Sequence, residues 1–428
     1  MSATSLAIIN ARLVDPASGH DAPGGVLVED GLIAQTGSEI DIHAADEVID
    51  AQGRILAPAL IDLRCAKEPG FTPDGETLSS LCEGAAAGGI GTLMLAPNRL
   101  TPMDKPESIA SLVSGFERQR LRLMACCGAT AGLDGMQMAE IGLMLKAGAA
   151  MAGHGDRPVA DTRTMRRLLA YTSQFDVWLG VRPADACLSD GAVALESDWS
   201  ARMGLPAEPA VSERIAIERD AALVELSGGK LFIDRLSTAS GIEALRHART
   251  RDLEIAASVA VAHLTLNEVD AGGLDSAFRM TPPLRAESDR RTLVEAVASG
   301  EIDAVVSDHR PTPFDDKGEP FALAIAGTMA VETLLGAMLG LVHEGELDLV
   351  EALRPLTCGP ADIMGLPQGR IAIGAPADLI LVDGDLPWVC RPDEFRSARA
   401  NSAWAGRRFQ GRVLQTIVGG VTIHNHRT

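Results

Sequence analysis

The sequence predicts an α/β protein: a (β/α)8 barrel of the TIM type with a small β-sandwich built from both chain ends. Three observations indicate this fold. The middle of the chain, from about 61 to 355, alternates apolar strands with amphipathic helices, as parallel βαβ units do. Both ends are instead rich in short strands separated by Gly and Asp. The 428 residues also suffice for a barrel of about 250 residues and a second, smaller domain.

The chain ends carry the pattern of short strands. The expected strand-rich runs are 6–15, 24–37 and 46–63 at the start, and 374–385 and 409–425 at the end. Because the two ends share this pattern and flank a long α/β region, we expect them to form one domain. The sequence therefore predicts a β-sandwich from residues 1–57 and 358–428, and a barrel from residues 58–357.

The middle of the chain supplies the expected βαβ units. Expected barrel strands lie within 58–63, 90–95, 120–130, 175–183, 230–238, 253–261 and 302–308. Expected helices lie within 78–88, 138–149, 213–229, 240–252 and 289–301. A doubly wound sheet is the alternative, but the strand-rich ends favour the barrel. The polar loop at 308–320 is long enough to act as a lid or a mobile segment.

Composition narrows the classes of partner. The formal net charge of −20 disfavours nucleic acid and anionic membrane surfaces. We find no apolar run of 18 residues and no basic, apolar signal sequence at the start. The seven cysteines form no C-x-x-C pair, so no structural zinc knuckle is indicated. Their odd number in a long chain fits a reducing compartment. We therefore expect a cytoplasmic protein that binds neither nucleic acid nor membrane.

Several motifs, in order along nearly the whole chain, carry a family resemblance. They include PALIDL (58–63), AAAGGIGTLMLAPN (85–98), DRPV (156–159), PPLRAESDRRTLVEAVASGEIDAVVSDHRP (282–311) and LPQGRIAIGAPADLILVD (366–383). The chain resembles dihydroorotases of the amidohydrolase superfamily. The resemblance implies a (β/α)8 barrel with a β-sandwich, and hydrolysis or closure of the dihydroorotate ring in pyrimidine synthesis. It also implies a zinc-bound hydroxide as nucleophile and an aspartate after the last barrel strand that moves the proton.

The positions where the resemblance places metal ligands do not carry them. After the first strand, where the family has His-x-His and a substrate-binding arginine, this chain has Arg64-Cys65-Ala66-Lys67. Lys67 takes the place of that arginine, as a point charge rather than a planar fork. Further along, His154 and Gly155 occupy the place of an acidic or lysine ligand, while Arg182 and Arg235 replace histidines. Arginine stays protonated and cannot bind zinc, so the sequence predicts no metal site and no zinc cofactor.

At the other positions of the implied site, some residues match the family pattern and others differ from it. Asn98 and Asp308 are kept, and Asp308 has the position of the proton-transferring aspartate. Thr281 and Thr312 replace an asparagine and a histidine of the family pattern. We therefore treat Asp308 as a vestigial catalytic residue. Lys67, Asn98, Arg182 and Arg235 are candidate groups for holding a substrate or another anion.

The arginines allow two interpretations. Arg64, Arg182 and Arg235 could replace the metal charge and pair with acidic groups such as Asp308 in a filled, inactive pocket. They could instead form an open pocket for an anion. A third view, that His154, His263 and His309 rebuild a metal site with Asp308 or Cys65, needs these histidines to converge. Cys65 is also a candidate nucleophile, although a cysteine beside a barrel strand is more commonly packed in the core.

These observations favour a protein without the family's catalytic activity. By resemblance, inactive dihydroorotase homologues accompany aspartate carbamoyltransferase in some bacteria and help it to assemble. The leading hypothesis is therefore a structural partner of that enzyme, present as a homodimer or a larger assembly. One alternative is an active cyclic amidohydrolase with a rebuilt or metal-free site. Another is a sensor that binds a carboxylate such as carbamoyl-aspartate without turnover.

Overall fold

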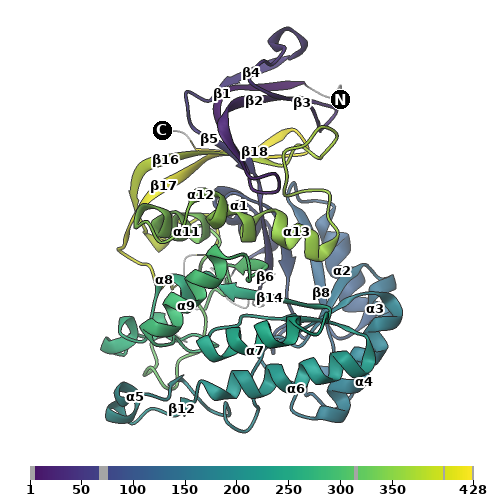
Figure 1. The fold of residues 1–428 in the computed structure, drawn as a ribbon, viewed down its shortest axis with the longest axis vertical. Helices are drawn as coiled ribbons and strands as arrows, with labels where there is room; N and C mark the ends of the chain where they lie inside the picture. Colours follow the sequence, from purple (N-terminus) through teal and green to yellow (C-terminus); the bar gives the residue numbers. More distant parts are fainter. Residues whose placement is uncertain (1–4, 67–75, 313–316, 399–400, 427–428) are drawn as a thin grey trace.

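The structure is a computed structural model that describes residues 5–66, 76–312, 317–398 and 401–426. The chain forms a large α/β body with a β-sheet packed on one end of it (Figure 1). Both chain ends lie in this sheet, as the sequence predicts. Within the described part of the chain, none of the helices has the length and hydrophobicity that crossing a bilayer requires.

The α/β body is the predicted parallel barrel. Its strands follow one another in space in the order β6 (Leu60–Cys65), β7 (Ile90–Leu95), β8 (Arg122–Gly128), β9 (Ala149–Gly153), β10 (Trp178–Val181), β13 (Lys230–Ile233), β14 (Ile255–Ala260) and β15 (Ala304–Val306). Cys65 and His309 form a parallel bridge that brings the last strand beside the first. The (β/α)8 prediction is therefore confirmed.

Helices alternate with the strands and cover the outside of the barrel (Figure 1). They are α1 (Leu78–Ala87), α2 (Pro106–Phe116), α3 (Ile141–Lys146), α4 (Thr162–Thr172), α6 (Val211–Ser227), α7 (Ala239–Arg249), α9 (Glu287–Ala298) and α11 (Leu334–His343). Their starts follow local chemistry: Thr77 caps α1, Asp161 caps α4 and Thr238 caps α7 with side-chain oxygens. Shorter elements in the connections are β11 (Ala194–Leu195), α5 (Asp198–Met203), β12 (Ala207–Glu208), α8 (Val261–Thr265) and α12 (Leu349–Leu353).

One barrel strand, β9, and three helices, α2, α4 and α11, were not expected from the sequence. β9 has the sequence AAMAG, which lacks the β-branched and aromatic residues that mark strands. It is a strand because parallel neighbours β8 and β10 supply its hydrogen bonds on both sides. The helix α4 follows it. Tertiary pairing therefore decides this unit where local preference is weak.

The terminal domain is one hydrogen-bonded sheet in the order β18-β17-β16-β5-β1-β2-β3, with β4 also paired to β1. The strands are β1 (Leu6–Asp15), β2 (His20–Glu29), β3 (Leu32–Gly37), β4 (Glu47–Asp50), β5 (Ile55–Pro58), β16 (Leu379–Val389), β17 (Arg408–Val418) and β18 (Val421–Asn425). β5 pairs with β1 on one side and with β16 on the other, which joins the two chain ends. The helix α13 (Cys358–Met364) packs against the interior of the barrel through Ala361.

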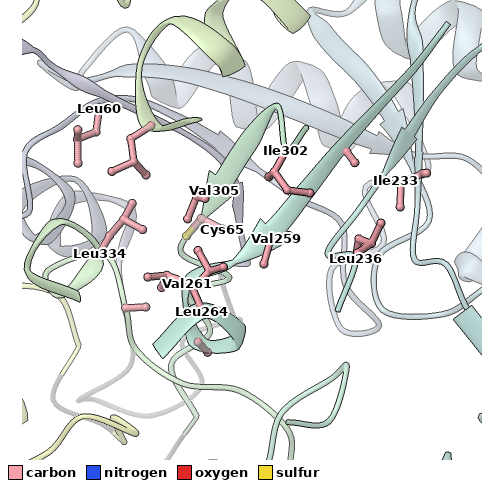
Figure 2. Packing of buried hydrophobic residues seen from close by; sticks show 14 of the residues in the cluster. Leu60, Cys65, Ile233, Leu236, Val259, Val261, Leu264, Ile302, Val305 and Leu334 are labelled. Atoms are coloured by element: carbon pink, nitrogen blue, oxygen red, sulfur yellow. The ribbon is translucent and has the colours of Figure 1, made fainter. Parts of the chain in front are cut away.

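The barrel has two apolar layers. Inward side chains such as Ile61, Met151 and Phe232 fill its interior, together with Ala361 of α13. Outward side chains such as Leu60, Val259 and Val305 meet the helices, and Figure 2 shows them beside Leu334 and the sulfur of Cys65. The interior is therefore a packed core rather than a channel. Charged residues can gather only at its open end, where the strands finish.

Candidate functional site: an arginine–aspartate network in the barrel mouth

Seven charged residues lie at the carboxyl ends of the barrel strands, where enzymes of this fold place their catalytic groups. They are Arg64, Asp156, Arg182, Asp234, Arg235, Asp308 and Arg310. Six of them form a single ion-pair network, and Arg182 forms a separate one with Glu208.

Arg64 enters the mouth because the register of β6 changes. Ile61 and Leu63 both face the barrel interior, so strict alternation would turn Cys65 inward and Arg64 outward. The pairing of β6 with β7 shifts between Asp62 and Cys65, and this irregularity reverses the alternation. Cys65 consequently packs in the outer apolar layer, and the Arg64 guanidinium lies in the mouth.

The Arg64 guanidinium binds three carboxylates, one with each of its nitrogens. Its Nη2 lies 2.7 Å from Asp156 Oδ1, its Nη1 2.9 Å from Asp234 Oδ2, and its Nε 3.3 Å from Asp308 Oδ1. The side chain is 5% exposed. Every donor nitrogen of the fork thus has an ionic partner, which lysine could not provide from one position.

Arg235 repeats this arrangement from the end of β13. Its Nη1 lies 2.9 Å from Asp156 Oδ1 and 3.1 Å from Asp308 Oδ1, and its Nη2 lies 3.3 Å from Asp234 Oδ2. Nη1 also donates to the carbonyl oxygen of Thr281 at 2.7 Å. Burial lowers the pKa of Arg235, but Asp234, Asp308 and Asp156 outweigh burial and raise it above its ordinary value.

The backbone at two of these residues is strained. Arg235 has a φ of 63° and Asp308 a φ of 48°, in the left-handed region that costs non-glycine residues free energy. Both residues stand directly after a barrel strand and point their side chains at each other. The ion pairs between them are therefore formed against a local backbone preference.

The carboxylates of the network differ in their electrostatics. Burial raises the pKa of Asp156, but Arg235, Arg310 and Arg64 together overcome it, so this pKa lies below the usual range. Burial also raises the pKa of Asp308, and the arginines offset this only in part because Asp156 and Asp234 act in the opposite direction. Arg310 adds a third guanidinium, with Nη1 2.7 Å from Asp156 Oδ2. Among the described residues, the network therefore joins three arginines to three aspartates.

The described residues beneath the network enclose a small cavity. A cavity of about 10 Å³ is lined by Arg64, His154, Phe232 and Asp234 among others. One water molecule needs roughly this much room, so the cavity is too small for a ring substrate. Of the two interpretations offered by the sequence, this geometry corresponds to the filled pocket.

Arg182 corrects one sequence expectation, because it does not join the carboxylates around Asp308. Its Nη2 lies 2.7 Å from Glu208 Oε2, and Arg285 Nη2 lies 3.7 Å from the same oxygen. All three side chains are buried. Burial lowers the pKa of Arg182, and Arg285 adds to this effect more than any other cation. The strand β12, which the sequence did not predict, brings Glu208 to this position.

The other candidate residues have structural contacts. Asn98 is buried, and its side-chain oxygen accepts hydrogen bonds from the backbone N–H groups of Leu100 and Thr101 at 2.9 and 2.8 Å. It therefore closes the turn after β7. Thr312 donates its N–H to Asn401 Oδ1. Lys67, the remaining candidate, lies outside the described residues.

The three histidines do not converge. His154 contacts the hydroxyl of Thr130 at 2.8 Å and the carbonyl of Arg157 at 2.8 Å. His263 lies 3.2 Å from the carbonyl oxygen of Pro283, and burial followed by Arg285 lowers its pKa to about 3. His309 lies between Glu76 and the N–H of Ala330. Each is accounted for by its own local partners.

The residues present do not fit a zinc ion. Within the described ranges, no cluster of three His, Cys, Asp or Glu side chains is arranged to hold a metal. The three carboxylates that point into the mouth all bind guanidiniums, which are cationic and offer no lone pair. Zinc requires three or four such donors at about 2.0–2.3 Å. The donor set is therefore incompatible with the metal chemistry that the family resemblance implies.

Comparison with known proteins gives the relationship of the whole chain. A family model described as "Amidohydrolase family" matches residues 224–423. A dihydroorotase of Anaeromyxobacter dehalogenans strain 2CP-1 is 34% identical over 424 residues, covering 98% of each chain. A "dihydroorotase-like protein" of Pseudomonas aeruginosa is 33% identical over 423 residues, covering 98% of this chain and 99% of that one.

The chain belongs to the dihydroorotase family.

Solved structures show the same architecture for this dihydroorotase homologue. An L-hydantoinase (dihydropyrimidinase) from Arthrobacter aurescens superimposes with a TM-score of 0.88, over 99% of this chain and 96% of that one. A D-hydantoinase superimposes with a TM-score of 0.83. Their sequence identities of 22% and 21% make this a likeness of fold. The barrel and the terminal sheet therefore have the same architecture as these two hydantoinases.

Sequence reasoning missed four residues that matter in the mouth of this dihydroorotase homologue. They are Asp156, Glu208, Asp234 and Arg310. Asp234 and Arg310 each stand within two residues of a position that was singled out, and Asp156 begins the DRPV motif. The available signal was that acidic and basic residues follow the same barrel strands. Glu208 had no such signal, because it comes from a long excursion between β10 and β13.

Proposed function

We propose that this chain is a catalytically inactive member of the dihydroorotase family that serves as a structural partner of aspartate carbamoyltransferase. The proposed inactivity rests on the positions of Arg64 and Arg235. Their guanidiniums hold Asp156, Asp234 and Asp308 from within the barrel mouth. The carboxylates thus have fixed positive partners that belong to the chain itself.

The electrostatic barrier to a metal can be put in numbers. A dication about 4 Å from one guanidinium is repelled by roughly 8 kcal/mol at an effective dielectric constant of about 20. Two guanidiniums double this penalty before any ligand is considered. The carboxylates cannot offset it without first leaving Arg64 and Arg235 unpaired and buried, which is itself destabilising.

The position of Asp308 also argues against proton transfer. A general base must reach the proton it removes, directly or through one water. Asp308 Oδ1 already accepts hydrogen bonds from Arg64 Nε and Arg235 Nη1, and Oδ2 lies 3.2 Å from Arg235 Nη1. Its side chain is only 21% exposed. We therefore assign Asp308 a structural role as a bridge between two arginines.

The partner half of the proposal rests on the family resemblance and on what the chain retains. The fold is complete at both the barrel and the terminal sheet, whereas the ligand positions carry arginine. A chain that keeps the family's fold but lacks its metal ligands is suited to a structural role in the assembly of a complex. By the same resemblance we propose a cytoplasmic location, within a homodimer or a larger complex in which the carbamoyltransferase is the second component.

The first experiment tests inactivity. The purified chain, produced with added zinc and no chelator, is assayed for metal content and for dihydroorotate hydrolysis beside the Anaeromyxobacter dihydroorotase as a positive control. We expect less than about one-tenth zinc per chain and no turnover above buffer. Turnover that disappears in Asp308→Asn but persists in the surface variant Arg214→Gln would overturn the inactive assignment and favour an amidohydrolase.

The second experiment tests the partnership. The aspartate carbamoyltransferase of the same genome is purified with and without this chain, and its assembly is followed by size-exclusion chromatography with light scattering. We expect a joint complex and a carbamoyltransferase that loses activity or thermal stability when alone. A carbamoyltransferase that assembles and works normally without this chain would contradict the proposal.

A further inference from the structure

A cleft of about 640 Å³ lies where the barrel meets the terminal sheet, and none of its lining residues belongs to the arginine–aspartate network. Its walls come from the end of α1, the start of α11, the strands β16, β17 and β18, and the segment 391–396. These elements lie together in Figure 1, on the side of the sheet that faces α11. We call this space the seam cleft. Its volume is typical of a small-molecule site.

The charged side chains of the seam cleft are unevenly balanced. Arg391, Arg396 and Arg412 face it, against Glu332 and Glu394. Glu394 forms an ion pair with Arg391 at 2.9 Å. Burial lowers the pKa of Arg412, and the nearby carboxylates of Glu394 and Glu332 offset this only in part. The seam cleft thus carries three arginines against two glutamates, in a chain whose net charge is −20.

Glu332 does not neutralise this charge as an ion pair. Its Oε1 accepts hydrogen bonds from the backbone N–H groups of Arg396 and Ser397, at 2.8 and 3.0 Å, and from the Ser397 hydroxyl. These bonds tie the segment that bears Arg396 to the start of α11. Glu332 therefore holds this wall of the cleft in place, and Arg396 is one of the residues that line it.

Two histidines of β18 and the residues after it add titratable groups to the same wall. His424 is 8% exposed, and burial followed by Arg396, His426 and Arg412 lowers its pKa to about 4. Burial, Arg412 and Arg396 also lower the pKa of His426. Burial and, after it, the nearby arginines thus favour the neutral form of each histidine. A bound anion would reverse this effect, because it favours the protonated form.

The guanidinium of Arg412 is held in position by an aromatic ring. It lies 5.3 Å from the ring centroid of Trp388, which in turn donates its Nε1–H to the carbonyl of Gly411 at 2.9 Å and packs against Phe409. A cation over a tryptophan face keeps its N–H groups available at its edge. Arg412 is therefore a preorganised donor rather than a freely moving surface side chain.

We infer that the seam cleft is a binding site for a small polyanion that carries two or more phosphate or carboxylate groups. Arg396 and Arg412 would each donate paired N–H groups to an anionic group, and His424 and His426 would donate once protonated. The enclosing walls favour a small molecule over an extended acidic peptide. The site is independent of the barrel mouth, so it can exist whether or not the chain is catalytic.

Isothermal titration calorimetry of the full-length chain with sodium triphosphate and with citrate tests the inference. We expect binding at one site per chain, and the tighter of the two probes shows whether phosphate or carboxylate is preferred. Arg396→Gln and Arg412→Gln should each weaken it at least ten-fold. Arg408→Gln is the matched control, because Arg408 is an exposed arginine of β17 outside the cleft. Thermal unfolding of each variant without ligand checks that it is folded.

The pH dependence gives a second readout. Arg391, Arg396, Arg412, Glu332 and Glu394 line the seam cleft together with the two histidines, and burial raises the pKa of Glu332. A bound anion favours the protonated form of each histidine. Binding should be several-fold tighter at pH 6 than at pH 8. The double variant His424→Gln with His426→Gln should remove most of this difference.

Three outcomes would overturn the inference. One is the absence of heat and of thermal stabilisation with either probe at millimolar concentration. Another is equal weakening by Arg408→Gln, which would show general attraction to surface charge. The third is binding of a polyglutamate peptide without binding of triphosphate or citrate, which would make the cleft a docking site for a macromolecule.

Discussion

Arg64 and Arg235 donate hydrogen bonds to the same oxygen atom, Asp308 Oδ1, at 3.3 and 3.1 Å. One arginine comes from the first barrel strand and the other follows the sixth, so this shared oxygen ties opposite parts of the barrel mouth together. Asp156 and Asp234 likewise bind both arginines. The network is therefore a set of bridges, and each member should affect the stability of the whole barrel.

Replacing Arg235 by alanine should lower the free energy of unfolding by about 3–5 kcal/mol, because it leaves partly or fully buried carboxylates without one of their two partners. Urea denaturation followed by circular dichroism measures this change. The control is Arg214→Ala, which removes an exposed pair with Glu218 on α6 and should change stability by less than about 0.5 kcal/mol. A loss below about 1 kcal/mol for Arg235→Ala would show that the network does not support the fold.

Removing the buried negative charge of Glu208 should destabilise the fold more than removing the positive charge of Arg182. Glu208 is the anionic partner of Arg182 and lies near Arg285, so Glu208→Gln leaves two buried cations together. Arg182→Gln removes one cation and leaves Glu208 with Arg285. We expect Glu208→Gln to destabilise the chain more than Arg182→Gln, by roughly 1–3 kcal/mol. A double-mutant cycle in urea measures both, and the reverse order would contradict the prediction.

Asp62 should make stability depend on pH between about 4 and 6. It is fully buried, and burial raises its pKa from 3.8 to about 6 despite hydrogen bonds from Ser307 and from the N–H of Arg64. A carboxyl whose pKa is raised by folding stabilises the fold below its unfolded pKa, and this contribution disappears as the pH rises through about 6. Relative to the parent, Asp62→Asn should therefore gain up to about 3 kcal/mol between pH 4 and pH 6.

Urea denaturation at pH 4, 5, 6 and 7 measures this difference. Glu218→Gln, an exposed carboxylate of α6, is the control and should follow the parent at every pH. A constant difference between Asp62→Asn and the parent would mean that Asp62 is ionised throughout this range.

Cys187 should react with a thiol-alkylating reagent much faster than the other six cysteines. Cys187 is exposed, whereas Cys65, Cys82, Cys126, Cys127, Cys358 and Cys390 are buried. Burial also raises the pKa of Cys65 well above its ordinary value, with Glu76 and Asp62 adding to the effect, which removes the thiolate needed for reaction. Iodoacetamide labelling followed by mass spectrometry should modify Cys187 alone in the native protein and all seven after unfolding. Rapid labelling of Cys65 would restore it as a candidate nucleophile.

The strands of the barrel show where sequence reasoning was sufficient. β7, with the sequence IGTLML, was predicted from 90 to 95 and lies at those residues, because a continuous apolar run between a glycine-rich helix end and a polar loop favours a buried parallel strand. β9, with its alanines and glycine, offered no such preference and depends on its neighbours. Local pattern is informative only where the residues themselves favour one conformation.

The candidate site divides in the same way. The sequence alone determined that arginine stands at positions where the family resemblance expects metal ligands, since that follows from residue identity and order. Only the tertiary structure decided what those arginines do. Arg64 points into the mouth because of a register shift in β6. Arg182 binds Glu208 rather than Asp308 because the segment that contains β12 folds back over the mouth.

The physical reason is the range of the interactions involved. Composition, hydrophobic periodicity and turn residues act over a few positions, so the chain by itself determined an acidic α/β barrel with a strand-rich domain at its ends. An ion pair acts between residues that may be hundreds of positions apart, and its energy depends on distance and burial that the fold must first create. The pairing of Asp308 with Arg64 and Arg235, and the cleft between barrel and sheet, were therefore decided only by the folded structure.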